Sequence, residues 1–148
     1  MRGQNLHATA VLLGDRGVLI AGESGSGKTT LALSLIDRFR RAGQFSRLVS
    51  DDQVLLTGRN GRILCRAPDA IAGLVEVYGV GPQPLEFEMA MVADLLIRLV
   101  ADAASQRFQE EKTESLAGCS IPCLEFAADS VEMAIFAVSS RFSMPPFR

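Results

Sequence analysis

The amino-acid sequence predicts an α/β domain, on three observations. Short apolar runs of strand length recur along the chain, and GVLIAG at 17–22 is continuous enough for a strand buried on both faces. A glycine-rich loop follows this run directly. After the loop, apolar residues recur at helical spacing, at Leu31, Leu35, Ile36 and Phe39. A strand, a loop and an amphipathic helix in this order indicate a helix packed on a sheet.

The composition fits one globular domain, and we expect residues 1–148 to form it. Hydrophobic residues make up 48% of the chain and charged residues 22%, a balance that excludes a disordered chain. The formal net charge of −2 gives no strong field toward nucleic acid or anionic lipid, so neither is expected as a partner. The N-terminus lacks the apolar core of a signal peptide, and no apolar run reaches the ~18 residues of a membrane span. We therefore expect a cytoplasmic protein.

Three cysteines, Cys65, Cys119 and Cys123, stand in apolar surroundings. An odd count in such settings favours reduced thiols, as in a cytoplasm. Cys119 and Cys123 form a C-x-x-x-C pair, but the only histidine, His7, is far away in the sequence. We interpret the cysteines as small buried hydrophobic residues rather than as zinc ligands.

The first elements are expected in a simple order. A strand at 7–13 turns through GDRG into the strand at 17–22. The helix begins at Lys28 and ends near Arg41, because basic residues fill its last turn and Gly43 follows.

The segments after this helix alternate between strands and turns. Residues 53–67 are expected to form a hairpin around Arg-Asn-Gly, since Asn-Gly favours a tight turn. The others are expected as a strand at 47–50, a short turn or helix at 68–73, a strand at 73–81, a linker at 82–88, a helix or strand at 89–100, a polar surface stretch at 106–114, a strand at 121–127 and a helix over 130–142 capped by Asp129.

The loop GESGSGKT at 22–29 matches the P-loop (Walker A) pattern G-x-x-x-x-G-K-[ST]. Gly25 and Gly27 permit the backbone angles of a phosphate-binding cup at a helix N-terminus. Lys28 supplies a positive charge for the β- and γ-phosphates, and Thr29 a hydroxyl for Mg²⁺. The alternative is a glycine-rich turn without a ligand. The residues expected to contact ATP are Gly22, Glu23, Ser24, Gly25, Ser26, Gly27, Lys28, Thr29 and Thr30.

Acidic residues in two later segments could complete such a site. Asp51 and Asp52 follow an apolar strand, where one could hold a metal while the other accepts a proton; the alternative is a polar turn that closes the strand. Glu76 lies among valines, so it is either paired or metal-bound in a core strand, or exposed on an edge strand.

These features occur in a particular order: NLHATAVLLGDRGVLIAG, GESGSGKTTLAL, SRLVSDDQVLL and AIAGLVEVYGVG. Over residues 5–82 the chain resembles the HPr kinase/phosphorylase family, and more narrowly its short proteobacterial form, which consists of the catalytic domain. The resemblance implies a P-loop domain with a mixed sheet, related to phosphoenolpyruvate carboxykinase. It implies ATP-dependent phosphorylation of a serine on HPr, a carrier protein of the phosphotransferase system. Many members also reverse this reaction by phosphorolysis.

The resemblance also implies roles for single residues. Asp51 would accept the proton of the serine, Asp52 would bind the metal or a water molecule, and His7 would support both acids. The implied magnesium ligands are Thr29, Asp52 and Glu76. Lys28 would stabilise the transferring phosphoryl group, and Arg107 corresponds to a further family arginine.

One departure from the family pattern stands in the strand that carries Glu76. Where the family reads Glu-x-Arg-Gly, this chain has Tyr78 in place of the arginine. The loss of a cation near the transferred phosphate predicts weaker activity or an altered substrate, and it puts phosphorolysis in more doubt than kinase activity. Two alternatives stay open: a kinase of another acceptor, and a module that binds a nucleotide without transferring phosphate. The resemblance implies a homo-oligomer, a hexamer of catalytic domains.

Overall fold

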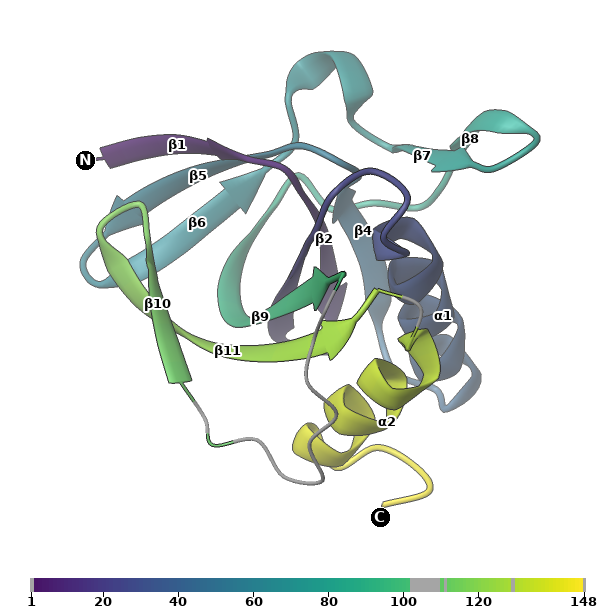
Figure 1. Ribbon diagram of the computed structural model, residues 1–148. Coiled ribbons are helices and arrows are strands. Elements are labelled where there is room, and N and C mark those ends of the chain that lie inside the picture. The colour runs from purple at the N-terminus through teal and green to yellow at the C-terminus, as the bar shows by residue number, and fades with distance from the viewer. Residues whose placement is uncertain (1, 102–109, 111, 129, 148) are drawn as a thin grey trace.

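The computed structural model describes residues 2–101, 110, 112–128 and 130–147 (Figure 1). In this part of the chain a curled nine-stranded sheet is covered on one face by two helices. The strand order is β1-β5-β6-β9-β3-β2-β4, and β11 joins β9 while β10 joins β11. The strands are β1 (Arg2–Leu6), β2 (Ala8–Leu13), β3 (Arg16–Ala21), β4 (Ser46–Ser50), β5 (Val54–Arg59), β6 (Arg62–Arg66), β9 (Ala90–Val100), β10 (Lys112–Leu116) and β11 (Cys119–Ala127).

The remaining elements are two helices and a small separate sheet. α1 (Lys28–Arg41) and α2 (Val131–Arg141) lie together on the same side of the large sheet. β7 (Leu74–Val77) and β8 (Gly81–Pro84) pair only with each other and project from the body of the molecule, after a short 3-10 helix at Asp69–Ile71.

The sheet is mixed, which confirms the expectation of a mixed α/β fold. β3, β9 and β11 run parallel to one another, whereas the other pairs are antiparallel. β9 joins the two halves of the sheet, because its first residues pair with β6 and its later residues with β3 and β11. The sequence left residues 89–100 open between helix and strand; they form β9, whose Leu95 and Leu96 face opposite cores.

Each face of the sheet has its own apolar core. One core packs the sheet against α1 and α2, and the other fills the inside of the curl between strands. β2 and β3 contribute to both because successive side chains point to opposite faces: Ile20 and Val11 face the helices, while Leu19 and Ala10 face the curl.

Several elements differ from the sequence prediction. β1 precedes the expected first strand; its residues, RGQNL, carry no apolar alternation, and pairing with β5 makes it a strand. The predicted linker at 82–88 is wrong in part, because residues 82–84 belong to β8. In the predicted polar stretch at 106–114, residues 112–114 lie in β10. The predicted cap Asp129 lies outside the described residues.

The hairpin, in contrast, is confirmed. Asn60 and Gly61 both have positive φ values, 54° and 75°, as a type I′ turn requires between β5 and β6. No helix in the described ranges is both long and apolar enough to cross a membrane.

Because of the direction in which the strands run, the segments that carry the predicted site residues lie together at one edge of the sheet. β3 and β4 are both antiparallel to β2, so they run in the same direction and end at the same edge. The glycine-rich loop follows β3 there, Asp51 and Asp52 follow β4, and β2 begins there just after His7. Ligands of open α/β sheets bind at such an edge.

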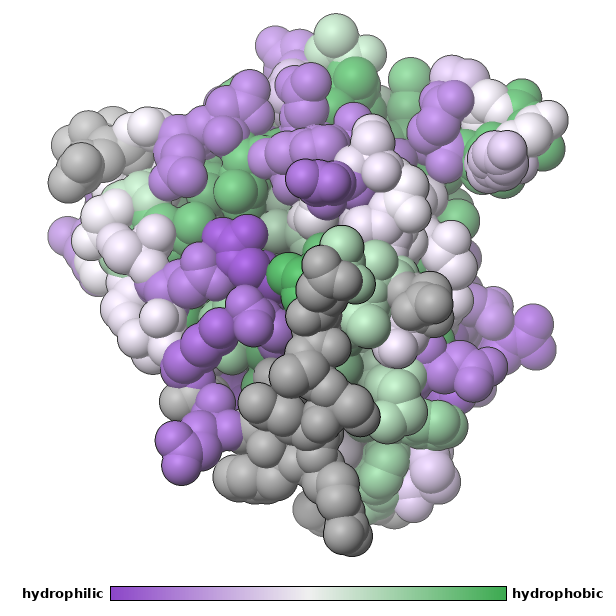
Figure 2. Space-filling model, viewed as in Figure 1, coloured by the Kyte–Doolittle hydropathy of each residue, from purple (hydrophilic) through white to green (hydrophobic). Residues whose placement is uncertain are grey.

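Two ion pairs link β9, β10 and β11. Both Arg98 Nε and Nη2 donate to the carboxylate of Glu114, and Lys112 Nζ lies 2.9 Å from Glu125 Oε2. Figure 2 shows hydrophilic side chains gathered over the region of β10 and β11. Glu114 also accepts a bond from the thiol of Cys123 at 3.0 Å. Burial, together with this carboxylate, raises the pKa of that thiol to about 12, which keeps it protonated.

Glu114→Gln is expected to lower the free energy of unfolding at pH 7 by about 1–3 kcal/mol, the usual contribution of a hydrogen bond to a charged group. The bonds from Arg98 hold the pKa of Glu114 below its usual value of 4.5. A lowered carboxyl pKa stabilises the fold above the unfolded-state pKa, and this stabilisation is lost as the pH falls through the folded-state pKa. The deficit of the variant should therefore shrink below pH 4.5 in urea titrations. Asp15→Asn, at a side chain that is 97% exposed, is the control and should show almost no deficit at either pH.

Candidate active site

The glycine-rich loop between β3 and α1 requires its glycines. Gly25 and Gly27 have φ values of 82° and 104°, in the left-handed region. A Cβ at Gly27 would also lie 3.1 Å from Val131 Cγ2, at the start of α2. A Cβ at Gly22 would lie 2.5 Å from Ser26 Oγ and 2.9 Å from the carbonyl oxygen of Leu99. The loop is therefore packed between β9 and α2, and its shape excludes larger residues at these positions.

Lys28, the first residue of α1, is buried with 5% of its surface exposed. Its Nζ donates to the carbonyl oxygens of Gly22 at 3.0 Å and Glu23 at 3.1 Å. It also lies 3.6 Å from Asp52 Oδ1. The ammonium group is thus held between the loop and the acidic residues that follow β4.

Asp51 is buried, and both of its carboxylate oxygens accept hydrogen bonds. Oδ1 accepts from the hydroxyls of Thr9 and Thr29, each at 2.9 Å, and Oδ2 accepts from the backbone N–H of Glu76 at 2.9 Å. Strand β2, helix α1 and strand β7 therefore converge on one carboxylate. With three donors bound and 5% of its surface exposed, Asp51 is a rigid, enclosed group.

Asp52 has different surroundings, although it is the next residue. Its backbone lies in the left-handed region at φ 69°, and its side chain is 53% exposed. Oδ1 lies 2.6 Å from His7 Nε2, and the backbone N–H donates to Thr9 Oγ1 at 3.2 Å. The carboxylate of Asp52 can thus be reached from solvent, and it has an imidazole on one side and the Lys28 ammonium on the other.

The structure brings together five of the predicted side chains: His7, Lys28, Thr29, Asp51 and Asp52. It places the two adjacent acids in different surroundings. The enclosed, hydroxyl-bonded carboxylate is Asp51, which was expected to accept the proton. The exposed one beside His7 is Asp52, which was expected at the metal.

The other predicted residues have fewer side-chain contacts at this site, or lie outside the described residues. Glu76 reaches the site through its backbone; its side chain is exposed on β7, which matches the edge-strand alternative. Glu23, Ser24, Gly25 and Thr30 are exposed at the loop and the first turn of α1. Arg107 lies outside the described residues.

Thr9 is a site residue that the sequence interpretation missed. It is fully buried and bonded to both acids. The signal was present: a threonine stands within the apolar strand HATAVLL, and a buried hydroxyl in a strand needs a partner.

Within the described ranges, no three His, Cys, Asp or Glu side chains are gathered in a way that could hold a metal by themselves. Mg²⁺ does not require such a cage, because it is usually bound by one or two carboxylates together with phosphate oxygens and waters. The hydroxyl of Thr29 against Asp51 Oδ1, beside the loop, fits that kind of site. The three cysteines are free thiols and lie in the core, as predicted.

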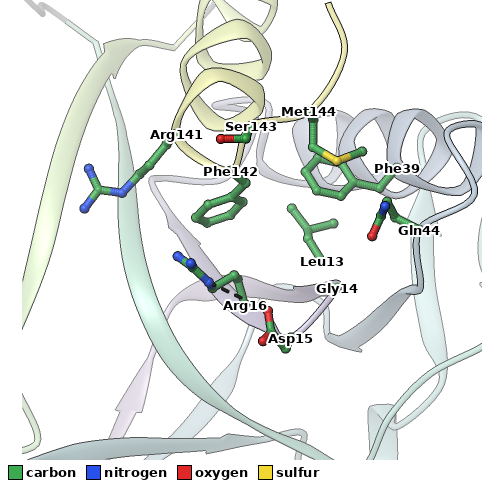
Figure 3. Close-up of a pocket in the computed structure, with 10 residues that line it drawn as sticks. All are labelled: Leu13, Gly14, Asp15, Arg16, Phe39, Gln44, Arg141, Phe142, Ser143 and Met144. Atoms are coloured by element: carbon green, nitrogen blue, oxygen red, sulfur yellow. Dashed lines mark ion pairs between the residues drawn. The ribbon is translucent and has the colours of Figure 1, made fainter. Parts of the chain in front are cut away.

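A pocket of about 180 Å³ lies at the opposite edge of the sheet (Figure 3). Its lining comes from the β2–β3 turn, the C-terminal end of α1 and the segment after α2: Leu13, Gly14, Asp15, Arg16, Phe39, Gln44, Arg141, Phe142, Ser143 and Met144. The 14 residues of α1 span about 21 Å. This pocket is therefore separate from the candidate active site and contains none of its residues.

Comparison with known proteins gives a consistent result. The family described as "HPr Serine kinase C-terminal domain" matches residues 2–84, which include Thr9 and every predicted site residue except Arg107. The HPr kinase/phosphorylase of Clostridium beijerinckii is 41% identical over 76 residues, which are 51% of this chain and 23% of that protein. That of Mycoplasma mycoides is 33% identical over 75 residues, 51% of this chain and 22% of that protein. The matched part is thus under a quarter of these relatives.

One solved structure is similar over almost the whole length of both chains. It is the Hpr(Ser) kinase/phosphatase from Coxiella burnetii, with a TM-score of 0.77 and 25% sequence identity. The similarity covers 95% of this chain and 96% of the other. The curled mixed sheet with its two helices is therefore shared beyond the residues that the family match covers.

Proposed function

Because the chain belongs to the family of HPr serine kinase C-terminal domains, we propose that it is an ATP-dependent protein kinase that phosphorylates a serine of HPr. In this proposal residues 1–148 act as one catalytic P-loop domain of the phosphoenolpyruvate carboxykinase type. The observation that carries it is the contact of Thr29 with Asp51 beside the buried Lys28, at the start of a helix. Phosphoryl transfer depends mainly on positioning and charge neutralisation, and this arrangement can supply both.

The loop and the first turn of α1 would hold the triphosphate. The backbone N–H groups at the N-terminus of α1 favour phosphate oxygens. Lys28 would move its three donors from the carbonyls of Gly22 and Glu23 to the β- and γ-phosphates. Thr29 and Asp51 would hold Mg²⁺, which neutralises charge on the phosphoryl group in transfer. Glu76 stays a candidate for the same ion, because its backbone N–H donates to Asp51 and its side chain is exposed.

For the proton acceptor we propose Asp52 rather than Asp51. A general base must be reached by the hydroxyl of the substrate, and Asp52 is half exposed whereas Asp51 is enclosed by three donors. The serine oxygen would attack the γ-phosphorus, the bond to the β–γ bridging oxygen would break, and the serine proton would pass to Asp52. His7, at 2.6 Å, would hold the carboxylate in place.

A second candidate is a module that binds the nucleotide without transferring phosphate, or a kinase of another acceptor. The observation that favours it is Tyr78, which is 96% exposed at the tip of the β7–β8 hairpin, where the family pattern has an arginine. Phosphorolysis, if present, would be weak for the same reason. We propose a cytoplasmic location and a homo-oligomer, with neither nucleic acid nor membrane as a partner.

Incubation with γ-labelled ATP, Mg²⁺ and HPr is expected to label HPr, and HPr with its acceptor serine replaced by alanine should stay unlabelled. Electrophoresis and autoradiography measure the label on the protein. ATP hydrolysis or labelling of a different protein, with HPr unlabelled, would favour another acceptor. Binding of ATP without any turnover would favour the regulatory module.

A further inference from the structure

Thr9 occupies an unusual position for a polar side chain. It lies in β2, has no exposed surface, and points to the same face as Val11 and Leu13, which pack in the core beneath α1. A hydroxyl in such surroundings is retained only with hydrogen-bond partners. Its partners are therefore the reason for a threonine at this position.

Those partners are the two consecutive acids of the site. Thr9 Oγ1 donates its proton to Asp51 Oδ1 at 2.9 Å and accepts the backbone N–H of Asp52 at 3.2 Å. A hydroxyl has one proton to donate, so donor and acceptor roles are both in use. Thr9 thus links the side chain of Asp51 to the backbone of Asp52.

The backbone at this point is held in a conformation that aspartate adopts rarely. Asp52 has φ 69°, and Gln53 donates its N–H to the carbonyl oxygen of Asp51 at 2.8 Å. The pairing of β2 with β4 shifts its register between Ala10 and Val11, just before this turn. Shifts of this kind redirect side chains at the end of a strand. The Thr9 bond anchors the turn that sends the two carboxylates into different surroundings.

We propose that Thr9 is a positioning residue of the phosphoryl-transfer site, which sets the carboxylate of Asp52 relative to Asp51 and Lys28. This inference rests on the proposed function for its effect on catalysis. Asp51 keeps two further donors, Thr29 and Glu76, without Thr9. We therefore expect the loss of the Thr9 hydroxyl to displace the carboxylate of Asp52, the proposed base, and to change the binding of Mg-ATP much less.

Thr9→Val keeps the shape of the side chain and removes the hydroxyl, whereas Thr9→Ser keeps the hydroxyl. In the labelling assay kcat of Thr9→Val should fall about 10- to 100-fold, with the Kd of Mg-ATP within about threefold, because a misplaced base costs rate more than binding. Thr9→Ser should restore kcat to within about threefold. Ser46→Ala is the matched control: Ser46 is equally buried and donates to the carbonyl oxygen of Ile36 at 2.9 Å, near the other end of α1.

A second measurement does not depend on activity. His7 is the only histidine, so the untagged protein has a single set of imidazole resonances in its NMR spectrum. Thr9→Val should shift them, because Asp52 Oδ1 lies 2.6 Å from His7 Nε2, whereas Thr9→Ser and Ser46→Ala should leave them nearly unchanged. If Thr9→Val does not fold, Thr9→Ala, which also lacks the hydroxyl, replaces it in both measurements. Unchanged kcat together with unchanged resonances in Thr9→Val would overturn the positioning role. A parent protein without transfer would refute the proposed function alone, and the resonances would still decide the role of Thr9.

Discussion

Lys28→Ala is expected to abolish phosphoryl transfer to HPr and to remove most of the affinity for ATP. Lys28 is buried and its Nζ is the cation next to the loop, 3.0 Å from the carbonyl oxygen of Gly22 and 3.6 Å from Asp52 Oδ1. The loss of one preorganised donor to the charge of a transition state usually lowers kcat about 100- to 1,000-fold. In the proposed site the same group would also bind the ground-state phosphates, so the Kd for ATP should rise as well. Calorimetric titration with ATP and the labelling assay measure the two effects.

Lys112→Ala is the matched control for this variant. It removes the same side chain from β10, where Lys112 pairs with Glu125 at 2.9 Å on the surface. Its transfer rate and ATP affinity should equal those of the parent protein. Thermal unfolding of both variants separates a local effect from a loss of fold, since Lys28 also ties the loop to α1. Full transfer activity and unchanged ATP affinity in Lys28→Ala would show that Lys28 does not have the proposed role at the phosphates.

The loop and the helix after it could be predicted from the sequence because their signals are local. A glycine at a left-handed position and apolar residues at helical spacing leave a pattern within about twenty residues. β1 and β8 leave no such pattern: apart from Leu6 their residues are polar or are glycine and proline, and each becomes a strand through the partner it pairs with. Such pairing depends on the tertiary structure, which a reading of local sequence cannot supply.

For the site, too, only the features that depend on nearby residues could be predicted from the sequence. Asp51 and Asp52 could be identified as a pair, but their roles depend on groups far away in sequence. Thr9 comes from β2, and the N–H that binds Asp51 Oδ2 comes from Glu76 in β7. Whether Glu76 lies in a core or an edge strand also depends on pairing, since β7 has only β8 beside it. The roles of these two adjacent residues were thus assigned from the family resemblance, without the contacts that distinguish them.

The second large effect is expected from Asp52→Asn, which should bind Mg-ATP like the parent protein and lose transfer to HPr. An amide cannot accept the serine proton, and the loss of a general base usually lowers the rate about 100- to 10,000-fold. The amide keeps nearly the same size at a half-exposed position, so the fold should tolerate it. Calorimetry with Mg-ATP and the initial rate of HPr labelling are the two measurements.

Asp51→Asn is the comparison that separates the two acids. Its side-chain NH₂ would face either the N–H of Glu76, which is a contact between two donors, or the hydroxyls of Thr9 and Thr29, which would have to turn and accept. In both cases the bonds to a charged carboxylate are lost. The free energy of unfolding should fall by about 1–3 kcal/mol, and the dependence of ATP binding on Mg²⁺ should weaken, because Asp51 and Thr29 would hold the ion. If instead Asp51→Asn keeps its Mg²⁺ dependence and loses only transfer, while Asp52→Asn stays active, then Asp51 is the base. The hydrogen bonds of Asp51 would then have to open for the serine to reach it, and the buried carboxylate would be enclosed only while the acceptor protein is absent.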